Sequence, residues 1–476
     1  MREFVLFAVV VSSACAPRPT GAGTSSPDEP GTRPAAMPSS EQIEARAPAT
    51  PTAGAVVLRN ARLLDGSGGP AKSGVDVLVV AGRIEQIGAK LAVPNDARVV
   101  DLGGRTLLPG FIDTHVHLTF TPAPSHEAGV TRGVKWHESD QALRGAAHAW
   151  ATLRAGFTTV RNVGGSFADR ALRDAIAQGV VPGPRMLVAN HAIGITGGHC
   201  DDTNGLHPDI APARSGWMAG TADGADEVRK AVRYQVKHGA DVIKLCATGG
   251  VMSQGDGVGN SQMTLDELRA AVDEAHRADR RVAAHAHGNA GIRDAVQAGV
   301  DSIEHGSVLD GDTVALMRKR GTYLVPTLYV GSVVERRANE GTLSAESAAK
   351  AKSIAPRMRE SFRLAYKGGV KIALGSDAGV FGHGENGREF TQMIEHGMTP
   401  MDAIVAGTKA AADLLGLTDV GLVRAGYRAD LVVVDGDPLK DPKLLETPAL
   451  VMKSGVIHVE PTWASTSTPG GSSGPS

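Results

Sequence analysis

The strongest structural signal in the chain is the run Leu107-Leu108-Pro109-Gly110-Phe111-Ile112-Asp113-Thr114-His115-Val116-His117. It has the apolar, β-rich composition of a buried strand and it ends in two histidines. Side chains two residues apart on a strand point to the same side, so both imidazoles can face one site. Polar groups placed at the end of an apolar strand indicate a functional position.

Apolar runs of this kind occur eight times between residues 107 and 379, and amphipathic stretches separate them. The eight runs are Leu107–Leu118, Phe157–Gly164, Arg185–Ile193, Ala240–Thr248, Arg281–Gly288, Asp301–Ser307, Thr322–Val330 and Lys371–Gly379. The helix-like stretches include Asp226–His238, Leu265–Ala278 with Thr264 as N-cap, Ala290–Ala298 and Thr313–Lys319. This alternation predicts an α/β fold of parallel βαβ units, and eight units predict a closed (β/α)₈ TIM barrel. A doubly wound open sheet is the alternative, but no G-x-G-x-x-G opens a helix after the first strand.

Two further β-rich pieces flank the predicted barrel, one over Ala55–Gly88 and one over Asp430–His458. Neither piece is large enough to form a stable core alone. We therefore expect both ends of the folded chain to pair into a small β-sandwich, with residues 54–106 as its first part and 418–459 as its second. The barrel is expected over residues 107–417.

The N-terminus has the features of a bacterial secretory signal. An apolar run, Phe4–Val11, is too short to span a membrane and leads to small residues and Cys15. The exit resembles a lipoprotein cleavage box, and a plain signal cut near Cys15 is the alternative. We expect residues 1–15 to be a signal peptide of an exported periplasmic protein or outer-membrane lipoprotein tethered through Cys15. Pro/Ser/Thr-rich residues 16–53 are expected to be a disordered linker and residues 460–476 a disordered tail.

Composition excludes several classes of function. Lys and Arg total 49 against 51 Asp and Glu, a net charge of -2, which gives no reason to expect a nucleic acid partner. Hydrophobic residues make up 42% of the chain, enough for a substantial core. Three cysteines cannot build a disulfide framework, so Cys200 and Cys246 are expected to be small buried thiols.

Costly polar residues recur at the ends of five of the predicted strands, where barrel enzymes place their chemistry. These residues are His115 and His117, Lys244, His285 and His287, His305, and Asp377. Each one alone has a structural explanation, such as a hydrogen-bonded core histidine or a turn aspartate. Together they form a metal-binding constellation.

Neutral imidazoles and a carboxylate are good ligands for zinc or another divalent ion. A lysine ammonium cannot bind a cation, but CO₂ can convert the Lys244 amine to a carbamate that bridges two ions. Two ions roughly 3.5–4 Å apart can hold a hydroxide and polarise a carbonyl. We therefore expect two divalent ions, with zinc as the first choice, and a carbamate on Lys244.

The pattern resembles the amidohydrolase superfamily from about residue 56 to residue 458. The resemblance rests on the 107–117 run and on Gly421-Leu422-Val423-Arg424-Ala425-Gly426-Tyr427-Arg428-Ala429-Asp430-Leu431-Val432-Val433. It implies that His115 and His117 bind the first ion and that carbamylated Lys244 bridges both. It further implies that His285 and His305 bind the second ion, and that Asp377 binds the first ion and acts as general base.

Gly197-Gly198-His199, Lys244 and His285-Ala286-His287-Gly288 are similar to a narrower group of binuclear peptidases and amidases. That group includes Xaa-Pro dipeptidases and amidases that cleave ochratoxin A; imidazolonepropionases are related and usually mononuclear. The resemblance makes His199 and His287 catalytic candidates, and makes His199, His287, Tyr329 and Arg161 candidates for substrate binding. Two departures from the group are Asn162, where many relatives have Asp, and His191, where others have Arg.

The sequence therefore predicts hydrolysis of an amide or peptide bond beside a free carboxylate by a metal-bound hydroxide. The substrate is expected to be a small amide, a dipeptide ending in Pro or another residue, or an N-acyl amino acid. A lactone or phosphotriester substrate is one alternative, and a metal-free binding scaffold is another. The sequence does not give the oligomeric state; the resemblance makes a homo-oligomer one possibility, since relatives often form even-numbered assemblies.

Overall fold

The structure is a computed structural model that describes residues 54–207, 209 and 216–463. The predicted signal peptide over residues 1–15, including Cys15, and the predicted linker over residues 16–53 lie outside the described part. Residues 464–476 of the predicted tail also lie outside it. Within the described ranges, no helix is both long and apolar enough to cross a membrane.

The core of the mixed α/β fold is built from parallel strands. One sheet contains β6 (Phe111–Val116), β7 (Phe157–Asn162) and β8 (Arg185–Val188), and a second has the order β12-β11-β10-β9. The second sheet contains β9 (Val242–Cys246), β10 (Arg281–Ala286), β11 (Ser302–His305) and β12 (Tyr323–Val325). An isolated parallel bridge between Ile193 and Leu245 links the two sheets.

The eighth predicted strand, Lys371–Gly379, has no regular strand geometry. It makes two isolated parallel bridges, from Ile372 to Leu324 and from Ala378 to Val116. Between them Asp377 adopts a left-handed backbone with φ of 63°, which interrupts a regular ladder. This segment therefore lies beside β12 at one end and β6 at the other.

Helices follow the strands in the order that the sequence predicts. Their bounds are α2 (His126–Lys135), α3 (Glu138–Arg154), α4 (Phe167–Ala177), α5 (Ala225–Lys237), α6 (Leu265–Arg277), α7 (Asn289–Ala298), α8 (Gly311–Arg320), α9 (Leu328–Glu340), α10 (Ala345–Lys367), α11 (Arg388–Glu395), α12 (Pro400–Ala406) and α13 (Lys409–Leu415). Short 3₁₀ helices cover Trp217–Ala219 and Pro442–Glu446. The predicted N-cap Thr264 is confirmed: it accepts a hydrogen bond from the Glu267 amide, and the Glu267 side chain accepts one from the Thr264 amide.

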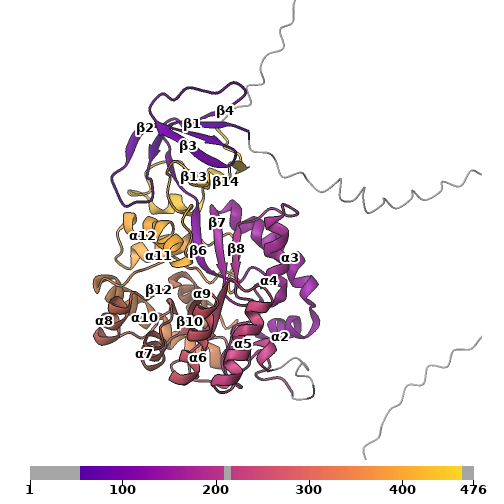
Figure 1. The fold of residues 1–476 in the computed structure, drawn as a ribbon. Helices are drawn as coiled ribbons and strands as arrows, with labels where there is room; N and C mark the ends of the chain where they lie inside the picture. The colour runs from indigo at the N-terminus through magenta and orange to yellow at the C-terminus, as the bar shows by residue number, and fades with distance from the viewer. Residues whose placement is uncertain (1–53, 208, 210–215, 464–476) are drawn as a thin grey trace, which may run out of the picture. The chain divides into compact units, whose positions relative to one another are not determined.

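Both ends of the described chain meet in one eight-stranded sheet, as the indigo and yellow segments of Figure 1 show. Its order is β15-β14-β13-β5-β1-β2-β3, with β4 paired to β1. Its strands are β1 (Val56–Leu63), β2 (Lys72–Val80), β3 (Arg83–Gly88), β4 (Arg98–Asp101), β5 (Thr106–Pro109), β13 (Leu431–Val434), β14 (Leu450–Lys453) and β15 (Val456–Val459). The antiparallel pairing of β5 with β13 joins the two chain ends, and Leu108 lies opposite Val432.

The run Leu107–Leu118 is not one strand, contrary to the prediction. Gly110 separates β5, in the sheet of the chain ends, from β6, in the parallel core. The Gly110 amide donates to the Asp430 carbonyl at 2.7 Å, and a Cβ at Gly110 would lie 2.3 Å from Thr158 Oγ1. Only glycine allows this close approach, and at this point the chain passes from one sheet to the other.

Contacts with the sheet continue past β15. Arg98 donates two hydrogen bonds to Glu460, and the Arg105 guanidinium lies 4.0 Å from the centre of the Trp463 ring. The Trp463 indole also donates to the Asp101 carbonyl. The sequence assigned Glu460 and Trp463 to the disordered tail, whereas these two residues pack on the sheet.

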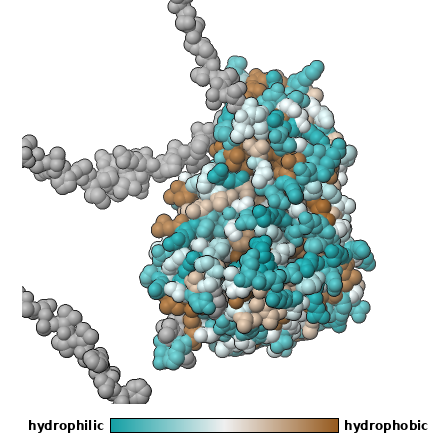
Figure 2. All heavy atoms as spheres, turned by 180° about the vertical axis from the view of Figure 1, so that it is seen from behind, coloured by the Kyte–Doolittle hydropathy of each residue, from teal (hydrophilic) through white to brown (hydrophobic). Residues whose placement is uncertain are grey.

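Hydrophobic residues are interspersed with hydrophilic ones on the face of the molecule shown in Figure 2. The largest buried cluster lies under the parallel strands and their helices, and a second fills the sheet made by the chain ends. The predicted metal ligands lie next to the first cluster, at the carboxyl ends of the parallel strands.

Candidate metal centre and active site

The predicted metal ligands converge at the carboxyl ends of the parallel strands. His115 lies near the end of β6, Lys244 within β9, His285 near the end of β10 and His305 at the end of β11. The remaining members, His117, His287 and Asp377, lie just past a strand end or in the segment bridged to β6. All seven line one cavity of about 740 Å³.

Two groups of potential ligand atoms share one histidine. The ligand atoms of His115, His305 and Asp377 all lie within 4.8 Å of one another, and so do those of His285, His287 and His305. Asp377 Oδ1 lies 3.2 Å from His117 Nε2 and 3.5 Å from His115 Nε2. Imidazole nitrogens and a carboxylate at this spacing fit a zinc-type divalent ion.

Each of these imidazoles is oriented by a hydrogen bond on the nitrogen that does not face the cluster. His115 Nδ1 donates to Glu304 at 2.7 Å and His117 Nδ1 donates to the Gly164 carbonyl at 2.7 Å. The Nδ1 atoms of His287 and His305 lie 2.6 Å from Ser307 Oγ and 2.7 Å from Thr327 Oγ1. His285 is held by the other nitrogen, because its Nε2 lies 3.3 Å from the Gly249 carbonyl. Such partners fix the ring and its tautomer, as in protein metal sites.

Burial keeps the clustered imidazoles neutral. It lowers the pKa of His115 to about 4 and that of His287 to about 3, and it places those of His285 and His305 well below the usual value. A histidine must be neutral to bind a metal ion, so the cluster is ready to do so at neutral pH. Burial also lowers the pKa of Lys244 to about 8, although Glu304 and Asp377 act to raise it.

Glu304 forms the base of the site and was not assigned a role from the sequence. It is fully buried, accepts from His115 and from Ser302 Oγ, and pairs with Arg161 at 2.8 Å. Burial alone would raise its pKa, but Arg161 and His115 bring the pKa down to about 2. The signal in the sequence was a carboxylate directly before His305 on a buried strand.

Arg161 does not face the substrate cavity, contrary to the prediction. Its guanidinium donates to Glu304, Ser302 and the Thr114 carbonyl, and the side chain is fully buried. The prediction assumed that Arg161, near the end of its strand, reaches the cavity. In the structure Arg161 lies in the core and neutralises the buried carboxylate of Glu304.

Tyr329 is also absent from the residues that line the cavity in the described part of the chain. The predicted strand Thr322–Val330 ends at Val325, and Tyr329 lies in the first turn of α9. Its hydroxyl donates to Glu385 at 2.7 Å and accepts from Arg388 at 2.9 Å. Glu389 accepts from the Leu328 and Tyr329 amides and so caps the helix that displaces the strand.

His199 and His287 line the cavity, and their catalytic and substrate-binding roles stay predictions. The His199 ring stacks on His285 with 4.1 Å between ring centres, and His287 stacks on His305 at 4.9 Å. His191 lines the same cavity and packs against Phe167. These side chains add polar groups around the ligand cluster.

Asn162, one of the two departures from the family pattern, supports His117 from behind. Its Oδ1 accepts from the Leu118 amide at 2.6 Å, and its Nδ2 donates to Asp169 at 2.9 Å. Burial raises the pKa of Asp169 to about 7. The amide thus holds the chain just after the His-x-His pair.

Left-handed backbone occurs at two of the site residues and at Thr327, whose hydroxyl contacts His305. His305, Thr327 and Asp377 have φ values of 70°, 48° and 63°, in the left-handed region that β-branched residues rarely occupy. Asp113 stabilises the backbone next to Asp377, because its carboxylate accepts hydrogen bonds from Ser376 and Asn386. The same carboxylate accepts from the His115 amide. Strain held in place by surrounding contacts is typical of functional sites.

The rest of the cavity is largely apolar and has no arginine among its described lining residues. Its apolar lining includes Val130, Val330, Val334, Ile354 and Met358. Its polar lining includes the histidines, Lys244 and Asp377. This division suits a ligand with an apolar group and one polarised bond.

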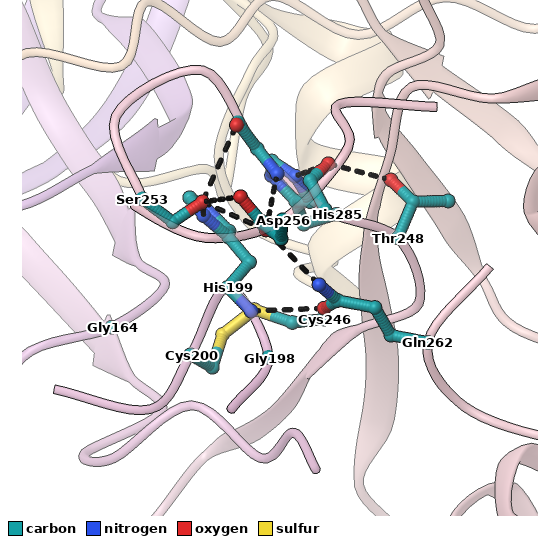
Figure 3. Close-up of a disulfide and its surroundings, with 12 residues drawn as sticks. Gly164, Gly198, His199, Cys200, Cys246, Thr248, Ser253, Asp256, Gln262 and His285 are labelled. Carbon is teal, nitrogen blue, oxygen red and sulfur yellow. Dashed lines mark hydrogen bonds between the residues drawn. A yellow bond between two sulfur atoms is a disulfide. The ribbon is translucent and has the colours of Figure 1, made fainter. Parts of the chain in front are cut away.

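Cys200 and Cys246 are joined by a disulfide, so the prediction of two free thiols is wrong (Figure 3). Their Cα atoms are 5.9 Å apart, and 46 residues separate them in sequence. Cys200 follows His199, and Cys246 ends the strand that carries Lys244. The pairing was hidden in the sequence because only the packing of the loop after β8 brings the two residues together.

The Amidohydrolase family matches residues 106–458 of this chain. The chain belongs to the amidohydrolase family. It is also 36% identical over 360 residues to ochratoxinase of Aspergillus niger, a match that covers 72% of this chain and 73% of that protein. The amidohydrolase assignment makes the protein a hydrolase related to ochratoxinase and prolidase.

Solved amidohydrolase structures have the same fold. A Xaa-Pro dipeptidase crystallised with methionine in the active site has a TM-score of 0.81 and 38% identity, covering 85% of this chain and 99% of that one. A prolidase in complex with N-methylphosphonate-L-proline has a TM-score of 0.76 and 32% identity, with 85% and 99% coverage. The ochratoxinase structure has a TM-score of 0.74 and 30% identity, with 86% and 96% coverage.

Glu304→Gln should weaken both stability and metal binding. The variant leaves the Arg161 charge unpaired in the core, a change that typically costs about 3–5 kcal/mol, and it loosens His115, which should lower metal affinity by about 10–100-fold. Urea unfolding and zinc titration measure the two effects. The matched control is Glu274→Gln, whose partner Arg233 is 61% exposed, and it should lose less than about 1 kcal/mol. Equal small losses in both variants would contradict the role given to Glu304.

Removing the disulfide should destabilise the protein by about 2–4 kcal/mol, because it frees a loop of this length in the unfolded chain. The measurement is urea unfolding of the Cys200→Ala/Cys246→Ala double variant against the oxidised parent. The parent in reductant should unfold at the same urea concentration as the variant. A parent whose unfolding is insensitive to reductant would show that the two sulfurs are not bonded.

Proposed function

We propose that this protein is a binuclear metal-dependent amidohydrolase that cleaves an amide or peptide bond next to a free carboxylate. The carrying observation is the pair of ligand groups that share His305, with buried Lys244 lining the same cavity. The names of the similar proteins, ochratoxinase and Xaa-Pro dipeptidase, support a carboxylate-bearing amide or dipeptide as the substrate class.

The donor set supports two ions. His115, His117 and Asp377 would hold the first ion, His285 and His305 the second, and Lys244 would bridge them as a carbamate. Among the described residues Lys244 makes no ion pair, and its lowered pKa leaves part of the amine unprotonated. An unprotonated amine can attack CO₂ and release one proton, which converts a buried cation into a carboxylate ligand.

Bound zinc-type ions would lower the pKa of a water molecule and polarise the scissile carbonyl. The work of the chain itself is to move the proton. Asp377 would accept it at a carboxylate oxygen and hand it to the nitrogen of the departing amine. Burial would raise the pKa of Asp377, but His115 and His117 hold it below the usual value, so the group is ionised and able to accept.

The strand pairing also supports a closed barrel as the scaffold for this chemistry. The parallel pairs of the two core sheets and the three bridges Ile193–Leu245, Leu324–Ile372 and Val116–Ala378 connect neighbours in a complete ring. We propose that the eight segments act as one (β/α)₈ barrel, with the ligands at its carboxyl-end face.

The function is tested by a mass-spectrometric screen with the Lys244→Ala protein as blank. The panel contains Xaa-Pro dipeptides, other dipeptides, N-acyl amino acids including ochratoxin A, and aryl lactones. We expect release of a C-terminal amino acid or proline by the parent and at least about 100-fold less by the variant, with partial rescue by small carboxylic acids. Turnover of lactones alone would contradict amide hydrolysis, and turnover that is unchanged in the variant would contradict the lysine bridge.

Asp377→Asn should separate metal binding from catalysis. An amide oxygen can still contact an ion but cannot take a proton, so we expect at least half of the parent's metal content and a rate lower by at least about 100-fold. Elemental analysis and single-substrate kinetics on the same preparation measure both. An active variant would remove Asp377 as the base.

We further propose that the protein is exported and lipidated at Cys15. The disulfide between Cys200 and Cys246 supports an oxidising compartment. Mass spectrometry of protein extracted from membranes should show a diacylated N-terminal Cys15, and Cys15→Ala should release the protein from the membrane fraction. A soluble mature chain that carries no lipid would contradict the tether.

A further inference from the structure

His199 lies in a hydrogen-bond network that leads away from the metal ligands (Figure 3). Its ring Nδ1 is 2.9 Å from Ser253 Oγ, and its backbone amide donates to Gln262 Oε1 at 2.9 Å. Gln262 Nε2 donates in turn to Asp256 at 3.0 Å. Both anchors of His199 therefore lead to the same carboxylate.

Asp256 is an ionised acceptor. It pairs with Lys350 at 2.7 Å and also accepts from the Gly250 amide at 3.2 Å, and its side chain is only 6% exposed. Although burial would raise the pKa of Asp256, Lys350 and Ser253 hold it below the usual value. An ionised carboxylate offers only acceptor sites to its neighbours.

The single hydroxyl proton of Ser253 decides the tautomer of His199. Ser253 Oγ lies 2.8 and 2.9 Å from the two Asp256 oxygens, and a charged acceptor binds the proton more strongly than a neutral nitrogen. The serine oxygen must then accept from His199, so Nδ1 carries the imidazole proton. His199 Nε2 is left as a lone pair, and it forms no hydrogen bond with any residue in the described part of the chain.

We propose that Asp256 and Ser253 are positioning residues that fix His199 as the Nδ1–H tautomer, so that its Nε2 accepts a hydrogen bond from the scissile amide N–H of the substrate. The proposal rests on the amidohydrolase function proposed above. It makes the substrate-binding role expected for His199 more specific, because a ring without a proton on Nε2 accepts a hydrogen bond there and cannot donate one to a carboxylate or a carbonyl. It also defines a substrate class: secondary amides, which carry an N–H, in preference to tertiary amides such as Xaa-Pro bonds.

Other contacts keep this geometry rigid. The disulfide links Cys200, the next residue, to the end of β9, and Gly250 packs on the His199 ring so closely that a Cβ there would lie 2.2 Å from it. The ring is therefore held from three sides: by the disulfide, by Gly250 and by the stacked His285. A flip of the His199 ring, or a shift of its proton to Nε2, would remove the hydrogen bond that Nδ1 donates to Ser253 Oγ.

The test compares Ser253→Ala with Ser253→Thr on two matched substrates, an N-acyl-L-alanine and its N-methyl derivative. The derivative replaces the amide N–H with a methyl group. We expect the parent to prefer the secondary amide. Ser253→Ala should lower kcat/KM for the secondary amide by about 10-fold and change that for the N-methyl amide by less than about 2-fold. Ser253→Thr keeps the hydroxyl and should retain at least a third of the parent value, with equal metal content in all three proteins.

A loss that is equal for both substrates, or equal in the alanine and threonine variants, would overturn the proposal in favour of a packing role. A parent that prefers the N-methyl amide would overturn it as well.

A readout independent of activity is ¹⁵N NMR of the zinc-loaded protein with labelled histidine, in which the His199 signals are assigned by their loss in His199→Gln. An Nδ1–H, Nε2-unprotonated ring in the parent supports the positioning role, and a proton on Nε2 overturns it. If the parent cleaves no amide but shows the expected tautomer, the proposed function fails while the positioning of His199 stands.

Discussion

The buried carboxylate of Glu304 is the constraint on which the site depends. A fully buried anion must be paired, and Glu304 is paired on one side by Arg161 and bound on the other by His115. The same carboxylate thus neutralises the buried Arg161 guanidinium and orients His115, a predicted metal ligand. A ring oriented in this way presents Nε2 to Asp377 Oδ1, 3.5 Å away. Contacts within the protein core therefore set the orientation of this predicted ligand.

Strain and hydrogen bonding act together at the strand ends. The backbone is left-handed at His305 and Asp377, where regular strand geometry ends or is interrupted, and both side chains line the cavity. Asp113 and Thr327 stabilise these positions through hydrogen bonds to neighbouring chain segments. A regular strand would carry the same side chains away from the cluster. The site is thus formed where the sheet geometry ends.

The residues that the structure brings to one cavity could be grouped from the sequence because period-2 spacing and strand ends are local properties, and their role as metal ligands stays a prediction. Side chains two residues apart on a strand point to the same side, and this places His115 with His117 and His285 with His287. The errors concern properties that depend on distant contacts. Gly110 divides an apparent single strand because Thr158 approaches it, and Tyr329 lies in a helix because Glu389 caps that helix from another part of the chain. Arg161 is directed downward by a carboxylate on another strand, and the cysteine pair is created by loop packing.

The sheet made by the chain ends has a consequence for the order of folding. Residues 106–109 pair with residues 431–434, so β5 has β1 beside it early in synthesis but lacks its second neighbour, β13, until almost the whole chain has left the ribosome. The apolar cluster around Leu107 stays incomplete during that interval, because it also contains Leu431, Val433 and Leu450. Pairing of such sequence-distant segments is slow, and unpaired strand edges promote aggregation. The first strand of the parallel core begins directly after β5, so completion of this sheet also fixes the start of the segment that carries the first two histidines.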